Sequence, residues 1–201
     1  MSHRLLGAVA SPFVRKVRVL IAEAGIEGIA FETVQSSPLG GEDRINTANP
    51  LGKIPALLRD EGPTIYDSRV ITRFLDARHH AGVYPEARLW EVLTLEATAE
   101  GIMDAAVGMV YETRFRPEAS RFEPWIDGQW TKVARALDAI EAQWMSHLSG
   151  PLDMGQIAVG CALGYLDLRH ADRDWRAARP DLAAWFDGFG ARASMQATAA
   201  E

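Results

Sequence analysis

The chain of 201 residues is 48% hydrophobic and 24% charged, which is typical of a soluble globular protein with a buried core. Its formal net charge of -6 argues against a general nucleic-acid-binding protein, which needs a basic surface. The apolar run around Cys161 is far shorter than the roughly 20 residues of a membrane span, and a single cysteine excludes an internal disulfide. The first residues lack the apolar region of a signal peptide. We therefore expect a cytoplasmic protein that binds neither nucleic acid nor membrane.

The first 81 residues alternate between short apolar runs and helical periodicity. Strands are predicted at 4–9 and 30–35, on either side of a helix from Pro12 to Ala24 that Gly25 ends. This order predicts a parallel βαβ unit with a right-handed crossover. The next predicted elements are a short helix at 42–48, strands at 56–59 and 64–66, and a helix at 68–81.

Beyond a bend at residues 82–86 the strand signal ends. Helices are predicted at 87–112, 129–148, 157–168 and 179–194. The helix at 157–168 is apolar nearly all round and should lie at the centre of this half. We expect an α/β domain over residues 1–81, a linker at 82–86 and an all-helical domain over 87–201.

The segment "ASPFVRKV", Ala10 to Val17, begins the first helix. Ser11 followed by Pro12 is a typical helix start, with the serine oxygen as N-cap. Arg15 and Lys16 come early in the helix, where the helix dipole disfavours cations unless an anion lies nearby. Two interpretations of Ser11 remain open: a structural cap, or a hydroxyl that acts on an anionic ligand.

The loop "NPLGKIPAL", residues 49–57, precedes a strand. Pro55 cannot donate to a sheet ladder, so it must open the strand or lie at an edge. Only ~5–6% of X–Pro bonds are cis, which favours a trans Ile54–Pro55 bond. In a cis turn the Ile54 amide and carbonyl would pair with a peptide-like ligand, and Lys53 would add a cation. The alternative is a surface turn with a solvated lysine.

The segment "YDSRVITRFL" places Asp67 and Ser68 at a helix start. Either residue can simply cap the helix. The pair also suits a zwitterionic amino-acid group, because Ser68 and the helix amides can hold a carboxylate while Asp67 holds an ammonium.

Taken in order, these three segments resemble the glutathione-binding domain of the glutathione S-transferase family. "DMGQIAVGCALGYLDLR" resembles the capped core helix of that family, and residues 179–198 resemble its C-terminal ending. "SPFVRK" and "AEGIMDA", residues 99–105, are most similar to a bacterial subgroup with serine at the sulfur-contact position. The resemblance implies a thioredoxin-like domain (βαβαββα) followed by a helical bundle, a homodimer, glutathione as co-substrate and no metal.

The resemblance also implies roles for individual residues. Ser11 would contact the glutathione sulfur as the catalytic residue, and Pro55 would be the cis-proline of the family. The glutathione contacts it implies are Ser11, Phe13, Lys53, Ile54, Pro55, Asp67, Ser68 and, reaching the partner's site, Asp104. The core helix departs from the family pattern, because Asp153 and Gln156 stand where Ser or Thr and Asp are usual; Asp can cap and Gln can close a capping box.

The chemistry to be expected follows from the pKa of a thiol, which lies near 8.5, so that a transferase gains rate by stabilising the thiolate. A hydrogen bond from Ser11 and the positive end of the following helix would do this. The electrophile is expected between the domains, near Met109, Tyr111 and Arg114, which suit a core equally well. Two alternatives to a transferase remain: a non-catalytic glutathione-binding protein, and a glutathione-dependent peroxide or disulfide reductase.

Overall fold

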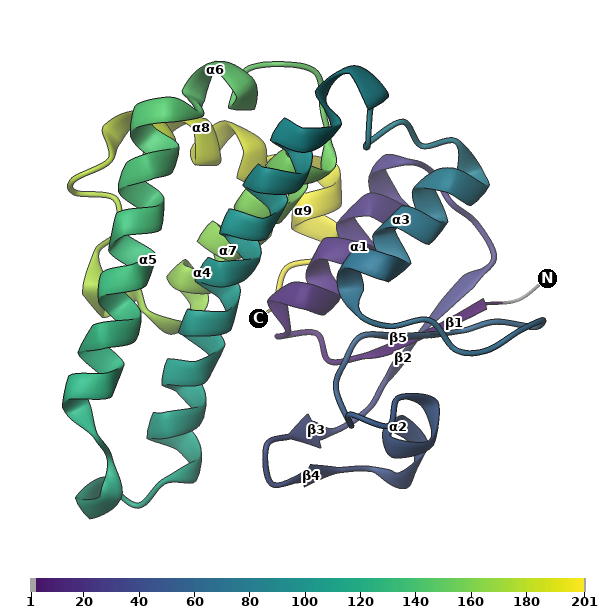
Figure 1. Cartoon of the computed structure of the whole chain (residues 1–201), viewed down its shortest axis with the longest axis horizontal. Coiled ribbons are helices and arrows are strands. Elements are labelled where there is room, and N and C mark those ends of the chain that lie inside the picture. The colour runs from purple at the N-terminus through teal and green to yellow at the C-terminus, as the bar shows by residue number, and fades with distance from the viewer. Residues whose placement is uncertain (1–2, 201) are drawn as a thin grey trace. The chain divides into compact units, whose positions relative to one another are not determined.

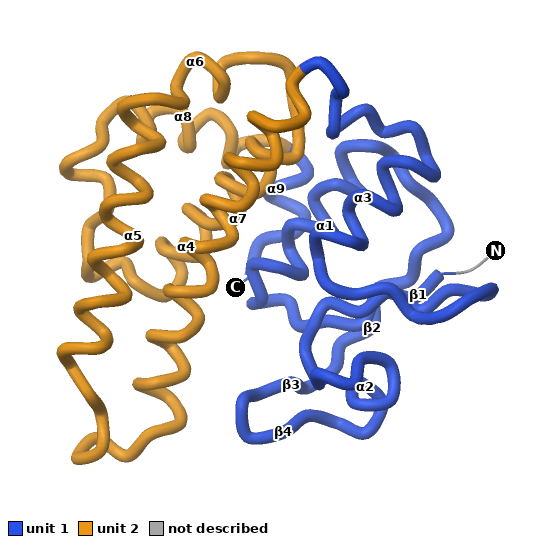
Figure 2. Tube along the Cα trace, in the orientation of Figure 1, with its two compact units in different colours: residues 1–87, 193–201 blue, residues 88–192 orange. Residues whose placement is uncertain are grey.

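The computed structural model describes residues 3–200 and contains two compact units (Figure 2). The first unit, unit 1, comprises the chain up to residue 87 together with the residues from 193 onward, and unit 2 comprises residues 88–192. The predicted all-helical domain included the residues from 193 onward, whereas by packing they group with the first unit. Among the described residues, no helix is long and apolar enough to cross a membrane.

The sheet of unit 1 has the strand order β2-β1-β5. Strand β1 (His3–Gly7) pairs in parallel with β2 (Ile29–Thr33), and α1 (Pro12–Glu23) connects the two, so the predicted βαβ unit is confirmed. Strand β5 (Ala56–Leu58) pairs antiparallel with the other edge of β1. Gly25 has a φ of 59° just after α1, as expected for a residue that ends a helix.

Helices α1 and α3 (Ser68–His79) pack together over one side of this sheet, and α2 (Asp43–Ala48) lies on the other (Figure 1). The packing of α1 depends on Gly7, because a Cβ there would lie 2.6 Å from Cγ1 of Val14. Only a glycine therefore lets the helix approach the end of β1 this closely. On the α2 side, the core consists of Leu6, Val34, Ile45 and Ala56.

Two expectations for the strands of this unit are wrong. The predicted strand at 64–66 is reduced to a single bridge between Leu57 and Ile65, because Pro63 has no amide with which to extend the ladder toward Arg59. The two-residue strands β3 (Ser36–Ser37) and β4 (Gly40–Gly41) were not predicted; they form a separate small hairpin.

Unit 2 is helical, as predicted. Its α-helices are α4 (Leu89–Phe115), α5 (Glu123–Gln143), α6 (Met145–Leu148), α7 (Met154–Arg169) and α8 (Pro180–Gly190). Helix α7 is buried almost throughout and packs against α4, which confirms its central place. The helix predicted at 129–148 instead begins at Glu123, where Pro124 fits the first turn, and breaks at Trp144. Single 3₁₀ turns lie at Glu86–Arg88, Glu118–Ser120 and Ala171–Arg173.

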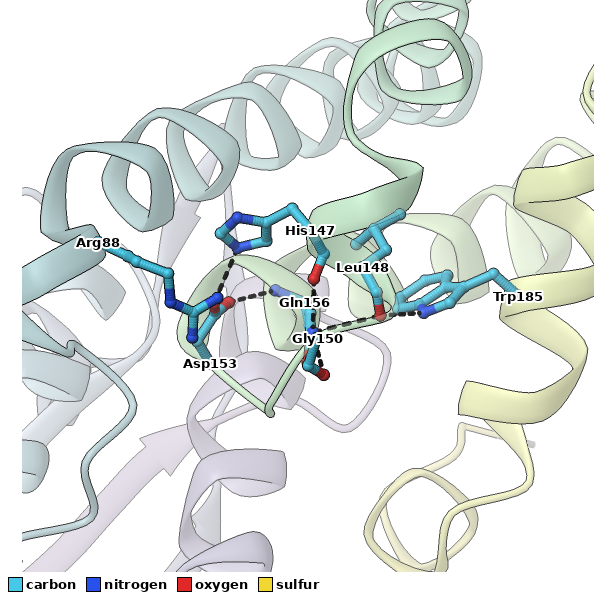
Figure 3. Close-up of polar contacts among 7 residues, drawn as sticks. All are labelled: Arg88, His147, Leu148, Gly150, Asp153, Gln156 and Trp185. Atoms are coloured by element: carbon cyan, nitrogen blue, oxygen red, sulfur yellow. Dashed lines mark hydrogen bonds and ion pairs between the residues drawn. The ribbon is translucent and has the colours of Figure 1, made fainter.

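The predicted cap of α7 is only half formed as a capping box (Figure 3). Asp153 is fully buried and accepts the amide proton of Gln156 at 3.2 Å, while its other oxygen lies 2.8 Å from Nε2 of His147 and 3.6 Å from Arg88. The Gln156 side chain does not return to Asp153. It donates to the carbonyls of His147, Leu148 and Gly150 at 3.1–3.2 Å, and so ties α6 and the following turn to α7.

The tail helix predicted at 179–194 is split, and its last part, α9 (Ala193–Ala197), packs on α1. The Arg15 guanidinium donates to the carbonyl of Met195 at 2.9 Å and contacts the Thr198 hydroxyl at 3.5 Å. The Ser194 hydroxyl donates to the carboxylate of Glu23. These contacts explain why the C-terminal residues group with the first unit.

Candidate functional site

The register of the sheet brings the predicted site segments to one edge of unit 1. Leu6 of β1 lies opposite Ala56 of β5, and the antiparallel register puts Pro55 level with Gly7, the last residue of β1. From Gly7 the chain runs on to Ser11. Leu57 lies opposite Ile65, and the antiparallel direction then carries Asp67 toward the level of Pro55. Helices α1 and α3 begin at this same edge (Figure 1). The edge thus gathers two helix N-termini and an X–Pro turn.

Ser11 caps α1, as predicted. Its half-buried hydroxyl accepts the amide proton of Val14 at 3.4 Å, and its own amide donates to the Ala8 carbonyl at 3.0 Å. A hydroxyl has two lone pairs and one proton, so a serine that accepts from the helix still has its O–H to donate. Capping and ligand contact are therefore compatible at Ser11. Phe13, two residues on, is half-buried.

The early cations of α1 have contacts that the sequence did not predict. Arg15 holds α9, as described above, and Lys16 is fully buried. Arg18 stacks over the ring of Phe31 at 4.6 Å, and burial together with the Arg15 charge lowers its pKa. The positive end of α1 at this edge therefore comes from its amides and dipole, while Arg15 serves the packing of the unit.

The Ile54–Pro55 bond is cis, as the resemblance implied and against the general preference for trans. Within residues 3–200, neither the amide nor the carbonyl of Ile54 forms a hydrogen bond. A main-chain donor and acceptor beside a sheet are therefore open to an extended, peptide-like ligand. Lys53 is exposed. Asn49 positions this loop: it is buried, donates to the Lys53 carbonyl at 2.8 Å and accepts from the Leu51 amide at 3.0 Å.

Asp67 caps α3, accepting the Arg69 amide proton at 3.0 Å. Its carboxylate also forms an ion pair with the Arg69 guanidinium at 2.9 Å, an unpredicted contact between residues only two apart in the chain. Partial burial raises the pKa of Asp67, but the hydrogen bonds and charge of Arg69 outweigh burial and lower it. Asp67 is thus a carboxylate at neutral pH. Ser68 is buried in the first turn of α3.

The predicted residues on α4 differ in burial. Met109 is 2% exposed and belongs to the core of unit 2. Tyr111 is 37% exposed and meets the ring edge of Phe115 at 5.6 Å, and the Arg114 guanidinium lies 5.5 Å from the same ring. Asp104 is exposed on α4. Among the described residues, no group of three or more His, Cys, Asp or Glu side chains could hold a metal ion.

The fold and its site edge define a thioredoxin-like domain followed by a helical domain. Residues 10–78 match the model of the glutathione S-transferase N-terminal domain, and residues 123–188 match that of the C-terminal domain. Over 200 residues, 97% of both chains, the protein is 33% identical to the uncharacterized GST-like protein YibF of Escherichia coli (strain K12). The chain therefore belongs to the glutathione S-transferase family.

Two solved structures are similar over 100% of both chains. A glutathione transferase family member from Pseudomonas fluorescens Pf-5, with bound glutathione, is 45% identical with a TM-score of 0.97. A family member from the same organism, with bound S-(propanoic acid)-glutathione, is 44% identical with a TM-score of 0.91. These likenesses confirm the predicted fold.

Proposed function

We propose that this protein is a glutathione transferase that binds glutathione at the sheet edge of unit 1 and transfers its thiolate to a small electrophile. The observation that carries the proposal is the convergence of Ser11, the unpaired Ile54 backbone and the Asp67–Ser68 pair at one edge. Glutathione bound to a relative that is 45% identical over 100% of both chains supports it.

In the proposed complex, the amide and carbonyl of Ile54 pair with the cysteinyl part of glutathione, next to Pro55. Asp67 takes the γ-glutamyl ammonium, and Ser68 with the first amides of α3 takes the neighbouring carboxylate. Lys53 reaches the glycine carboxylate, and Phe13 packs beside the tripeptide.

Ser11 donates its O–H to the glutathione sulfur while its lone pair caps α1. Lowering a thiol pKa from 8.5 by ~2 units takes about 2.7 kcal/mol. One hydrogen bond to a charged group contributes about 1.5–3 kcal/mol, so this single donor is of the required size. The thiolate then forms a C–S bond with the electrophile, and the displaced electron pair leaves with a halide or is protonated by water.

The thioether in the relative from Pseudomonas fluorescens Pf-5 favours transfer to carbon over peroxide or disulfide reduction, because a sulfur–carbon bond is the product of conjugation. The experiment combines calorimetric titration of glutathione with an activity screen over electrophiles, peroxides and mixed disulfides. We expect binding and conjugation, and replacement of Asp67 and Ser68 together by Ala should weaken binding by at least about tenfold. Binding without turnover of any electrophile would leave a non-catalytic binding protein.

We further propose a homodimer in which Asp104 of each chain reaches the γ-glutamyl ammonium in the partner's site. Asp104→Ala should then weaken glutathione binding. Mixing a chain that lacks Asp104 with a chain that lacks Ser68 should restore one intact site in each mixed dimer. Heterodimers seen by mass spectrometry without a restored high-affinity site would show that each chain binds alone.

A further inference from the structure

Arg114, near the end of α4, and Arg169, at the end of α7, differ from five arginines of unit 2 that form ion pairs. Within residues 3–200, neither forms an ion pair with a carboxylate, although the chain carries a net charge of -6. The arginines of this unit that do form such pairs are Arg88, Arg116, Arg173, Arg176 and Arg179. Two exposed cations are thus left without a protein counter-charge.

The charges of both guanidinium groups lower the pKa of the same buried phenol, that of Tyr165. Tyr165 lies on α7 one turn before Arg169 and is 6% exposed. Burial raises the pKa of Tyr165 to about 12, against the charges of Arg169 and Arg114, which lower it. The Tyr165 ring lies 6.4 Å from the ring of His170. Helices α4 and α7 meet beside this point, where Nε2 of His170 lies 3.0 Å from the Ala106 carbonyl oxygen. The cluster is therefore shared between two packed helices of one unit.

Tyr111 completes this cluster. Burial raises the pKa of the Tyr111 phenol, against the charge of Arg114, which lowers it. Tyr111 in turn contributes to the raised pKa of Tyr165. Both phenols therefore keep their O–H at neutral pH and can donate hydrogen bonds. Phe115 lies against Tyr111 and under Arg114, which adds an aromatic surface beside the charged groups.

This set of groups suits an organic carboxylate. A guanidinium presents donors in a planar fork that matches a carboxylate, and such charge-assisted hydrogen bonds are the strong ones. Two like charges around one buried phenol repel each other, and an anion between them removes that repulsion. Of the acidic residues near this cluster, Glu112 is paired with Arg116. The charge of Asp172 raises the pKa of the adjacent His170, against the charges of Arg173 and Arg169. Arg173 is already paired with Asp127 at 3.2 Å.

We propose that Tyr111, Arg114, Tyr165 and Arg169 form an anion site that binds the carboxylate of the electrophilic co-substrate. The preferred electrophiles are then small organic acids with a reactive carbon, such as α,β-unsaturated or halogenated carboxylates. In an addition, the glutathione sulfur bonds to the β-carbon and the α-carbon takes a proton from water. In a displacement, the carbon–halogen bond breaks and the halide leaves with the electron pair. The co-substrate part of this inference rests on the proposed function.

The first test does not depend on glutathione. The protein is titrated with 4-nitrobenzoate and with 4-nitrobenzamide, which differ in charge but hardly in shape, and binding is followed by ligand-observed NMR. We expect the benzoate to bind at least about tenfold more tightly, as one charge-assisted contact allows. The Arg114→Gln/Arg169→Gln variant should lose this preference. The control, Lys132→Gln/Arg135→Gln, removes the same charge from exposed positions on α5 and should keep it. Equal affinity for the two probes in the wild type overturns the anion site.

The second test links the site to catalysis. Wild type and variants are compared in their affinity for S-(2-carboxyethyl)glutathione and S-propylglutathione, with glutathione itself as reference. We expect the carboxylate to favour binding in the wild type, the preference to vanish in Arg114→Gln/Arg169→Gln, and the affinity for glutathione to stay within about twofold. A preference for benzoate without a preference for the carboxylated thioether would overturn the co-substrate assignment. Failure to bind glutathione at all would instead refute the proposed function.

Steady-state kinetics give the same contrast for turnover. The substrates are 4-chloro-3,5-dinitrobenzoate and its carboxamide, from which glutathione displaces chloride. The double variant should raise KM for the benzoate at least about tenfold more than KM for the carboxamide. Tyr165→Phe keeps the ring and removes one donor, so its loss should be smaller than that of the double variant. An equal loss for both substrates would point to general damage to the site and contradict a carboxylate contact.

Discussion

The carboxylate of Asp67 and the guanidinium of Arg69 lie 2.9 Å apart at the start of α3. The carboxylate that we propose binds the γ-glutamyl ammonium of glutathione is therefore already paired with a cation. Both side chains are about half exposed. The Arg69 amide binds one oxygen of Asp67 and its guanidinium the other. Any ammonium that binds Asp67 must share these oxygens with Arg69.

Substitutions at this pair should therefore change glutathione affinity in opposite directions. Asp67→Asn should weaken binding by at least about tenfold, because it removes the charge of a charge-assisted contact. Arg69→Gln should strengthen binding about two- to fivefold, because it removes a competitor at an exposed site, where ion pairs contribute little. Calorimetry measures both, with Arg73→Gln on the same helix as control. If Asp67→Asn binds glutathione like the wild type, the γ-glutamyl subsite lies elsewhere.

Ser11→Ala should have two separable effects. Loss of the cap should lower the free energy of unfolding by about 1 kcal/mol. Loss of the O–H donor should raise the pKa of bound glutathione thiol by up to about 2 units and slow conjugation at neutral pH. Titration of the thiolate absorbance measures the second effect, and Ser11→Thr, which keeps cap and hydroxyl, serves as control. Coincident titration curves for Ser11→Ala and wild type would mean that Ser11 only caps α1.

Asp153 should matter for stability and not for ligand affinity. Asp153→Ala removes the cap of α7 and leaves donors around it unsatisfied, for an expected loss of about 2–4 kcal/mol in urea unfolding. Asp153→Asn keeps the capping oxygen and should lose less. The glutathione affinity of the folded fraction should not change in either variant. A large loss of affinity without destabilisation would contradict a purely structural role.

His170 should make stability depend on pH. Burial lowers its pKa below the ordinary 6.5, and the hydrogen bond to the Ala106 carbonyl only partly opposes this. The unfolded chain therefore takes up the proton first, so stability is full above pH 6.5 and decreases as the pH falls below it. The slope should not exceed about 1.4 kcal/mol per pH unit for one proton.

Urea unfolding between pH 7.5 and 5.5, values chosen about one unit either side of the imidazole pKa, measures this slope. His170→Gln should flatten it, whereas His79→Gln, at an exposed position on α3, should not. An unchanged slope in His170→Gln would place the pH dependence on another group, such as the buried His3, whose pKa burial also lowers.

The local signals of the sequence predicted much of this fold. Ser11–Pro12, Asp67 and Asp153 were predicted as helix starts because capping depends on neighbouring residues, and all three cap. What the sequence could not predict depends on distant partners. The register that brings Pro55 and Asp67 to the end of β1, the contact of Arg15 with Met195 and the three carbonyls that Gln156 binds all join segments whose approach no local pattern fixes.

The return of α9 to α1 has a consequence for the order in which the protein is completed during synthesis. Domains generally fold as units, the N-terminal one first, while the ribosome is still extending the chain. Here the hydrogen-bond acceptor of Arg15 lies beyond unit 2 in the chain, and Ser194 supplies the donor for Glu23. The unit that is translated first therefore acquires its final packing only after every helix of the second unit has been made.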